Sequence, residues 1–310
     1  MKKLLALTSA IAAGFATTAQ ADVAVSGSGK IGIINDGAAS SAKTQVQMGS
    51  AVSFALSTTT ANGMTIGTSM GLTRTTSVGD AAATVGGGEV FTFTTSGATI
   101  TVGNHKITGR ATGAVGSVVS DFMANETIAS TAEVDLDDVK GQGFTLATSV
   151  GSSAVAFSYI WDATTVQDNL GSTDASDTAF GVSASMPMGN LTLGLGYAGD
   201  DDGTNNDTTT GVSVAYGVGG GTLTVGYQST TEPSNNATQT SGKYVTSLDA
   251  DTSVSVGYST TKEGSNSSTR TTAALSRSLG GGASVFAEVD NRSGAGTTGT
   301  AFSVGTSVAF

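Results

Sequence analysis

The end of the chain alternates between large apolar and small polar residues, and this alternation most constrains what the chain can fold into. One parity carries Phe302, Val304, Val308 and Phe310, and the other carries Ser303, Gly305, Ser307 and Ala309. A period of two is typical of a β-strand whose two faces meet different surroundings. The pattern recurs along almost the whole chain, so the sequence predicts an all-β protein.

The first 21 residues have the pattern of an export signal. Two lysines are followed by an apolar stretch at residues 4–15, and Ala19-Gln20-Ala21 matches the small-x-small site of signal peptidase. The alternative is an N-terminal membrane anchor, but this apolar run is shorter than the roughly 20 residues that a spanning helix needs. We therefore predict a signal peptide at residues 1–21, cleaved after Ala21, and one β domain at residues 22–310.

The composition excludes several classes of protein. Acidic side chains number 24 against 13 lysines and arginines, so the chain lacks the clustered positive charge that binds nucleic acid. There is no cysteine, which excludes a disulfide scaffold and a thiolate metal site. Large aliphatic residues are too sparse for a conventional core and are confined to one parity. The apolar face therefore either forms the thin core of a stacked solenoid or faces lipid.

The apolar segments number sixteen, and their connections alternate in length. Short turns such as Asn62-Gly63 join them at one end. The connections at the other end are longer and polar: Asn35–Lys43, Thr75–Gly88, Asp162–Asp177, Gly199–Asp207, Thr231–Ser241, Lys262–Ser268 and Asn291–Gly296. Unequal ends and an even strand number, which allows closure, are typical of outer-membrane barrels. We predict a 16-stranded antiparallel transmembrane β-barrel with short periplasmic turns and long external loops.

Aromatic residues lie where a lipid boundary would place them. They occupy the apolar parity near the ends of their strands: Trp161, Tyr197, Tyr216, Tyr227 and Tyr258. Amphipathic rings at this height form the interfacial girdles of membrane barrels. The placement favours lipid over a solenoid core.

One long connection, at about residues 104–142, interrupts the strand pattern. Apolar residues within it follow the spacing of one helical face: Val115, Val118, Val119, Phe122 and Met123. The same segment carries six carboxylates: Asp121, Glu126, Glu133, Asp135, Asp137 and Asp138. Sixteen strands enclose a channel too wide for the wall's own side chains to fill, so an inward-folded loop with a short helix would narrow it and set its charge. An acidic loop solvated outside the barrel explains the same residues, and the residues alone leave both alternatives open.

Three stretches of the chain resemble a known family. The start Asp22-Val23-Ala24-Val25-Ser26-Gly27, the loop stretch 114–138 with Asp135-Leu136-Asp137-Asp138, and the end from Leu279 to Phe310 are similar to general porins of the alphaproteobacterial, Rhodobacter type. The middle of the chain matches only in pattern. The resemblance implies a homotrimer of sixteen-stranded barrels in the bacterial outer membrane, with the third loop folded into the lumen, through which small hydrophilic solutes diffuse passively. It also implies contacts with outer-membrane lipids and lipopolysaccharide, and recognition of the terminal Phe310 by the barrel-assembly machinery.

Porins of this family set acidic residues of the loop against basic residues of the facing wall. The corresponding cations are few in this chain: Lys30, Lys43, Lys243 and Arg270 on the wall, with Lys106 and Arg110 at the start of the loop. We therefore expect a weakly charged, cation-favouring opening instead of a strong transverse field.

Other chemistry is weakly supported. His105, the only histidine, has no Ser/His/Asp pattern around it and is interpreted as a polar loop residue, so we predict that the chain is not an enzyme. Asp200-Asp201-Asp202-Gly203 is interpreted as a solvated acidic loop because the closing Glu of a calcium loop is missing. A weak structural Ca²⁺ site is a candidate where a constricted loop would pack carboxylates together, at Glu133, Asp135, Asp137 and Asp138. No other cofactor is expected.

The competing function is that of a secreted or surface-exposed Gly/Ser/Thr-rich structural protein or adhesin without channel activity. A β-solenoid of that kind predicts a fixed repeat of about 20 residues or Gly-Gly-x-Gly-x-Asp units. Neither occurs in this sequence. The solenoid also leaves the aromatic placement and the terminal Phe310 without an explanation.

Overall fold

The computed structural model describes residues 21–35, 37, 44–77, 80–108, 139–165, 178–201, 206–231, 236–294 and 298–310. These residues form sixteen strands: β1 (Ala21–Asn35), β2 (Thr44–Thr59), β3 (Thr65–Ser77), β4 (Asp80–Thr94), β5 (Ala98–Lys106), β6 (Val139–Val150), β7 (Ser153–Thr165), β8 (Thr178–Met188), β9 (Leu191–Asp201), β10 (Asn206–Val218), β11 (Gly221–Thr231), β12 (Asn236–Ser247), β13 (Thr252–Glu263), β14 (Asn266–Gly280), β15 (Ala283–Gly294) and β16 (Gly299–Ala309). The prediction of sixteen strands is confirmed. Within the described ranges, no helix is long and apolar enough to cross a membrane.

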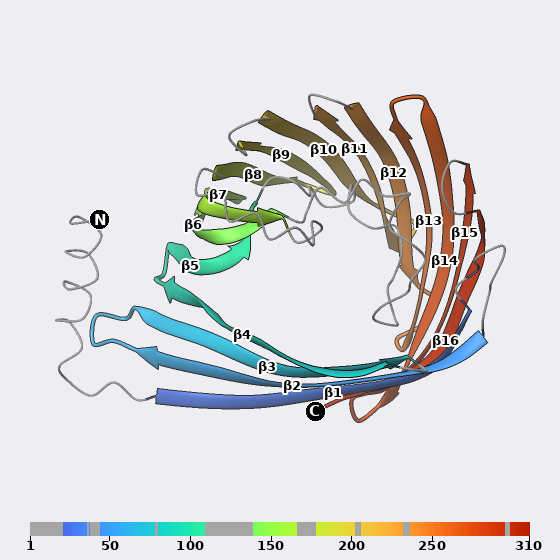
Figure 1. Ribbon diagram of the computed structural model, residues 1–310, viewed down its shortest axis with the longest axis horizontal. Helices are drawn as coiled ribbons and strands as arrows, with labels where there is room; N and C mark the ends of the chain where they lie inside the picture. Colours follow the sequence, from blue (N-terminus) through green and yellow to red (C-terminus); the bar gives the residue numbers. More distant parts are fainter. Residues whose placement is uncertain are drawn as a thin grey trace.

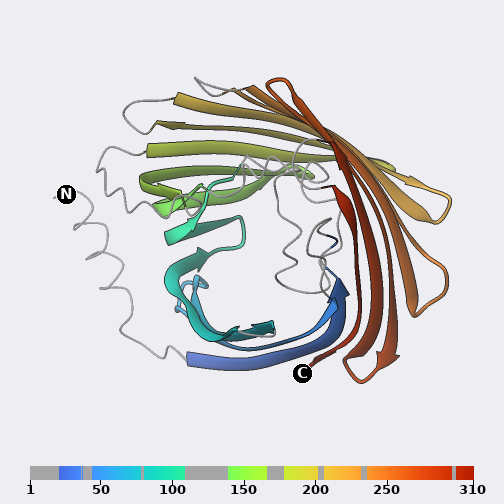
Figure 2. The ribbon, with the colours of Figure 1, turned by 45° about the vertical axis from the view of Figure 1, so that its right-hand side comes forward.

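The strands form one closed antiparallel barrel (Figure 1). Each strand pairs with its neighbours in the sequence, and β1 pairs with β16 to close the ring. Figure 2 shows the strands running obliquely around the interior. Closure satisfies the backbone groups that an open sheet leaves exposed at its edges, so the alternation that ends at Phe310 belongs to the strand that completes the sheet.

The end of the barrel that carries both ends of the described chain has short turns, as predicted. Two residues join β6 to β7, β8 to β9, β10 to β11 and β14 to β15. Gly151 and Gly189 adopt φ angles of 63° and 66°, a left-handed conformation that tight turns between strands require and that glycine adopts without strain. Ala21 pairs with Thr58, close to the β2–β3 turn, which places the start of β1 at the same end.

The turn between β12 and β13 is held by one carboxylate. Asp249 accepts hydrogen bonds from the Asp251 N–H at 2.8 Å and the Thr252 N–H at 2.7 Å, and it forms an exposed ion pair with Arg277 at 3.6 Å. The hydrogen bond from Asp251, supported by the Thr252 hydroxyl and the Arg277 charge, lowers the pKa of Asp249 below its usual value.

At the opposite end, several predicted loops are wrong because the strands continue through them. β3 and β4 stay paired as far as Ser77 and Asp80, so residues 78–79 alone join them in place of the predicted loop 75–88. β13 and β14 are joined by residues 264–265 instead of the predicted 262–268. The predicted loops 199–207 and 231–241 shrink to residues 202–205 and 232–235. Backbone hydrogen bonds extend these hairpins where side-chain alternation no longer marks a strand.

The long connection that interrupts the strand pattern is residues 107–138, shorter at both ends than the predicted 104–142. Asn104, His105 and Lys106 pair with Gln142, Gly141 and Lys140, so these residues belong to β5 and β6. The interpretation of His105 as a loop residue is therefore wrong. The expected helix within this connection lies outside the described residues. So do residues 1–20 of the signal peptide predicted at residues 1–21, whose last residue, Ala21, begins β1.

The terminal residue is held in the seam between β1 and β16. Gly27 and Phe310 exchange two backbone hydrogen bonds, each of 3.0 Å. The Phe310 ring lies over Gly27, where an added Cβ atom would come within 2.2 Å of the ring Cζ. A glycine at this position of β1 therefore leaves the space that the terminal ring occupies.

Candidate functional site: the barrel interior

The two faces of the barrel wall differ in chemistry as the alternation predicted. Apolar side chains point outward and stay exposed; Ile31 is 49% exposed and Val225 is 47% exposed. Small polar side chains alternate with them and point inward, among them Thr209, Ser213 and Ser259. A continuous exposed apolar surface is costly in water and favourable in lipid. The outer wall therefore fits a bilayer, and the inner wall fits water.

The outer face also carries the predicted aromatic residues. Trp161, Tyr197, Tyr227 and Tyr258 lie toward the loop ends of β7, β9, β11 and β13, and all four are exposed. Tyr216 lies near the turn end of β10. The ring of Tyr197 packs against that of Phe180 on the neighbouring strand β8, with centroids 5.7 Å apart. Their outward placement at two levels is the arrangement of interfacial girdles.

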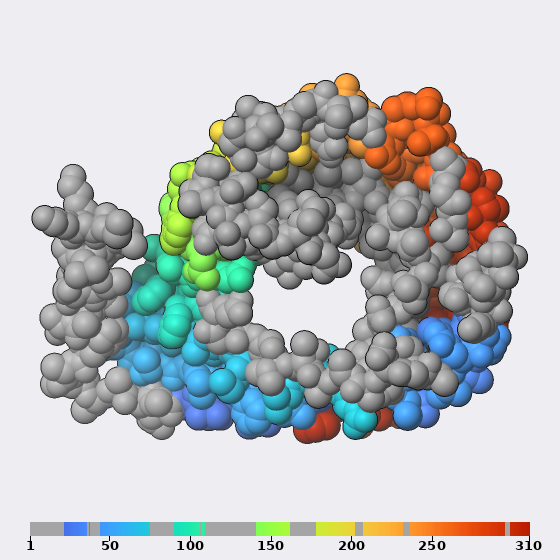
Figure 3. Space-filling view, viewed as in Figure 1, coloured from blue at the N-terminus to red at the C-terminus, as the bar shows by residue number. Residues whose placement is uncertain are grey.

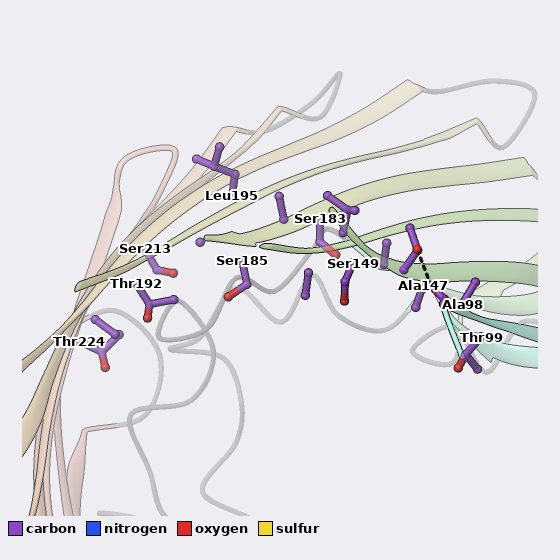
Figure 4. Close-up of a pocket in the computed structure, with 18 of the residues that line it drawn as sticks. Ala98, Thr99, Ala147, Ser149, Ser183, Ser185, Thr192, Leu195, Ser213 and Thr224 are labelled. Carbon is purple, nitrogen blue, oxygen red and sulfur yellow. Dashed lines mark hydrogen bonds between the residues drawn. The ribbon is translucent and has the colours of Figure 1, made fainter. Parts of the chain in front are cut away.

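The interior contains open space, seen as an opening in the middle of the ring in the space-filling view (Figure 3). A cavity of about 1050 Å³ lies against the inner wall from the β4–β5 turn to β12. Its lining is mostly serine, threonine, alanine and glycine, with Lys243 of β12 as the one charged residue among the described residues that line it. Figure 4 shows Ser185, Thr192 and Thr224 on the interior side of the sheet, with Leu195 on the opposite side. Hydroxyl groups thus face the space through which a solute would pass.

Charged side chains gather on a different part of the inner wall, on β14 and β15. Arg270 and Arg292 lie directly opposite each other across these strands. Asp290 binds both: it accepts from Arg270 Nε at 2.9 Å and Nη2 at 2.8 Å, and from Arg292 Nε at 3.1 Å. All three residues are at least 95% buried, as is Glu288. We call Arg270, Glu288, Asp290 and Arg292 the arginine cluster; its formal charges balance.

The first residues after β5 lie on the inner wall. Ile107 is 4% exposed and packs with the inward-facing Ile160 of β7, Ala179 of β8 and Ala198 of β9. The Thr108 N–H donates to Ser158 Oγ at 2.9 Å, and Thr108 Oγ1 lies 2.6 Å from Ser183 Oγ. The chain therefore leaves β5 across the interior of β7 and β8.

The structure places three of the predicted wall cations on the inner face. Lys30 lies on the inward parity of β1, opposite Gly49 of β2, and Lys243 and Arg270 lie in the cavity wall and the arginine cluster respectively. Lys106 ends β5, and the structure does not describe its side chain. The remaining predicted residues lie outside the described ranges: Lys43, Arg110, Asp121, Glu126, Glu133, Asp135, Asp137 and Asp138.

Glu288, Asp290 and Arg292 are inner-wall residues that are not among the site residues predicted from the sequence. The sequence predicts a loop at residues 291–296, whereas β15 continues to Gly294 and includes Arg292. The signal was available, because Glu288, Asp290 and Arg292 continue the inward parity opposite the outward Val289. Charged residues on one parity mark an inner wall as clearly as serine and threonine do.

The described residues offer no group of three or more histidine or carboxylate side chains that could hold a metal ion. Asp200 and Asp207 lie directly opposite each other on β9 and β10, the region interpreted as a solvated acidic loop. The candidate Ca²⁺ residues of the β5–β6 connection lie outside the described part of the chain.

A closed sixteen-stranded barrel with an apolar outer wall and an open, hydroxyl-lined interior defines an outer-membrane channel. A sequence profile of the Gram-negative porin family matches residues 6–297, and the chain belongs to this family. Family and fold indicate a channel in the outer membrane, not an enzyme, and they do not favour the adhesin alternative.

Solved structures of outer-membrane proteins, porins among them, share the fold. The trimer form of OmpT from Vibrio cholerae is 11% identical with a TM-score of 0.68, covering 94% of this chain and 99% of that one. The anion-selective porin from Comamonas acidovorans is 12% identical with a TM-score of 0.66, covering 94% and 100%. A triple mutant of the Rhodopseudomonas blastica porin is 19% identical with a TM-score of 0.61, covering 93% and 100%. No protein among the curated sequences matches this chain.

Proposed function

We propose that this porin is a passive diffusion channel for small hydrophilic solutes and ions, narrowed by the β5–β6 connection and weakly cation-favouring. The observation that carries the proposal is the position of Ile107 and Thr108 on the inner wall of β7 and β8. A connection that begins there is directed into the lumen. This supports the inward-folded loop over the loop solvated outside.

The proposed lack of solute specificity follows from the cavity lining. Hydroxyl and methyl groups of serine, threonine and alanine dominate it, and none of the described residues that line it is aromatic. Such a wall offers hydrogen bonds to any hydrated solute and no preformed pocket for one of them.

The proposed cation preference follows from the balance of charge. Glu288 and Asp290 offset Arg270 and Arg292, so the arginine cluster adds no net charge to the wall. The β5–β6 connection carries the six carboxylates named above and one basic residue, Arg110. An excess of fixed carboxylates at a constriction raises the local concentration of cations. The anion-selective porin from Comamonas acidovorans is 12% identical to this chain, so the likeness concerns the fold and not the charges of the channel.

Planar bilayers test this function. The wild-type protein should give stepwise conductance, and its reversal potential across a KCl gradient should have the sign of a modest cation preference. Replacing Asp135, Asp137 and Asp138 by asparagine should reduce that preference, whereas Asp249→Asn, in a turn outside the barrel, should not. An unchanged reversal potential in the triple variant would mean that these carboxylates do not line the opening. A weak Ca²⁺ site among Glu133, Asp135, Asp137 and Asp138 predicts that a chelator alters the conductance of the wild type but not of the triple variant.

The assembly of the channel is also proposed. The resemblance described above implies a homotrimer, contacts with lipopolysaccharide and outer-membrane lipids, recognition of Phe310 by the assembly machinery and membership of the alphaproteobacterial branch. Cleavage after Ala21 is proposed from the signal-peptide pattern. The trimer form of a similar structure supports the homotrimer. The mass of the detergent-extracted native protein and the N-terminal residue of the mature chain are the corresponding measurements.

A further inference from the structure

The start of the β5–β6 connection is fastened to two strands of the wall. The backbone N–H of Thr108 donates to Ser158 of β7, and its hydroxyl contacts Ser183 of β8. Ile107, the residue before it, is packed into the small apolar cluster with Ile160, Ala179 and Ala198. Two successive residues are therefore held, one by hydrogen bonds and one by apolar contact, before the chain proceeds.

A glycine makes this approach possible. A Cβ atom added to Gly181 of β8 would lie 1.7 Å from the carbonyl oxygen of Thr108. The φ angle of Gly181 is not in the left-handed region, so the strand itself does not require glycine here. Any other residue at this position would force Thr108 away from the wall by about 1.3 Å, the difference between 1.7 Å and a contact of 3.0 Å.

A chain of hydrogen bonds behind the contact orients Ser158. His105 Nδ1 donates to the Gly103 carbonyl at 2.8 Å, and Nε2 lies 2.8 Å from Thr145 Oγ1. Thr145 Oγ1 in turn donates to Ser158 Oγ at 2.9 Å. The only histidine of the chain thus supports, through Thr145, the hydroxyl that receives the Thr108 N–H.

We propose that four residues position the β5–β6 connection and thereby set the width of the channel and the frequency of its brief closures: Thr108, Ser158, Gly181 and Ser183. We call these four residues the root clasp. The inference rests on the proposed function, in which that connection narrows the lumen. The four are positioning residues, because they act through the connection that they hold. Ser183 and Ser185, two residues apart on the same inner face, both line the open cavity, and of the two it is Ser183 that contacts Thr108.

Replacing Gly181 by alanine tests the positioning role. A matched control is Gly49→Ala, because Gly49 also faces inward from a strand but a Cβ atom there meets only Arg74 O, at 3.8 Å. We expect Gly181→Ala to change the single-channel conductance and to raise the frequency of brief closures several-fold, while Gly49→Ala behaves as the wild type. A channel with the conductance and noise of the control overturns the proposal.

Engineered cysteines test the contact itself, even where Gly181→Ala folds poorly. The chain has no cysteine of its own, so the intended disulfide is the one intramolecular disulfide that Thr108→Cys with Ser183→Cys can form, and the 2.6 Å approach of the two hydroxyls allows it. Thr108→Cys with Ser185→Cys is the control, because residue 185 lies roughly 6.6 Å further along the strand. The first pair should cross-link in the folded protein. Equal cross-linking of both pairs, or of neither, rejects the root clasp.

The two experiments separate this inference from the proposed function. If the wild type conducts in steps and Gly181→Ala conducts as the wild type does, the root clasp is rejected and the diffusion channel still holds. Folded wild-type protein that does not conduct rejects the channel, and the cysteine pairs then still decide whether Thr108 is held at Ser183.

Discussion

The carboxylate of Asp290 holds the arginine cluster together, and its removal gives the largest effect that we expect from a single charge. Asp290 is 2% exposed and accepts three hydrogen bonds, two from Arg270 and one from Arg292. Asp290→Asn preserves the size of the side chain but removes its charge. Two buried guanidinium groups that face each other across β14 and β15 then lose the anion that binds both.

The magnitude follows from the geometry. Three hydrogen bonds between charged groups, at about 1.5–3 kcal/mol each, set an upper limit of roughly 5–9 kcal/mol. Breaking a buried ion pair from one side typically costs about 3–5 kcal/mol. The asparagine retains one oxygen that can still accept from Arg270, which favours the lower end of that range. We therefore expect the free energy of unfolding to fall by about 3 kcal/mol, roughly 100-fold in the unfolding equilibrium.

Urea unfolding in lipid vesicles, followed by the fluorescence of Trp161, measures this loss. Trp161 is the only tryptophan and lies exposed on the outer face, so its emission reports on the lipid contact. Asp249→Asn is the matched control, because its pair with Arg277 is longer, at 3.6 Å, and about half exposed. If Asp290→Asn loses no more stability than Asp249→Asn, the arginine cluster is not an interacting buried unit and the reasoning is refuted.

Three further changes test other parts of the wall. Gly27→Val occupies the space of the Phe310 ring, so a smaller fraction should reach the folded, heat-modifiable form than with Gly29→Val, where a Cβ atom meets Val308 at 3.4 Å and Gly49 O at 3.9 Å. Equal folded fractions on gels contradict this. Because the folded state lowers the pKa of Asp249, this group stabilises the fold above the pKa of the unfolded carboxyl, and the contribution is lost as pH falls through the lower folded value. The difference in urea midpoint between the wild type and Asp249→Asn should accordingly vanish on acidification, and a difference that persists in acid rejects the assignment. Lys243→Glu should shift the reversal potential towards cation preference with little change in stability, since Lys243 lines the open cavity; an unshifted potential places it outside the ion path.

The barrel itself is largely predictable from the sequence because lipid imposes a strict period of two. Ile31, Val225 and Tyr227 face outward where the alternation places them, and the count of sixteen follows. The ends of the strands are not predictable in the same way. Beyond the bilayer both faces of a hairpin meet water, so β3 and β4 continue through residues 75–77 and 80–88 on backbone hydrogen bonds alone, with no apolar parity to mark them.

The interior is less predictable for a related reason. Arg270 was placed on the wall because neighbouring apolar residues fix its parity, whereas Arg292 follows Asn291 and precedes a run of serine and glycine that reads as a loop. Its role depends on Asp290 and on Arg270, a residue of a different strand, and a single sequence does not reveal which cross-strand residues meet. Thr108 and Gly181 illustrate the same limit: 73 positions apart in sequence, they touch because the chain leaves β5 across β7 and β8.

The closed ring places the root clasp and the arginine cluster on opposite walls. β7 and β15 are separated by half of the sixteen strands in either direction, and Figure 1 shows them on opposite sides of the barrel. Substitutions this far apart have additive effects on stability unless another part of the chain contacts both. A β5–β6 connection solvated outside the barrel leaves the two walls independent. The inward connection proposed above starts at one wall and narrows the space towards the other, so it should couple them.

The double variant Gly181→Ala/Asp290→Asn distinguishes these two cases. We expect its loss of unfolding free energy to differ from the sum of the single losses by more than about 0.5 kcal/mol, the usual limit of additivity between distant sites. Gly49→Ala/Asp290→Asn is the matched control and should be additive, because Gly49 meets neither the root clasp nor the arginine cluster among the described contacts. Additivity in both double variants would place the connection away from the arginine cluster. The charge of the constriction would then be set by the connection without the arginine cluster.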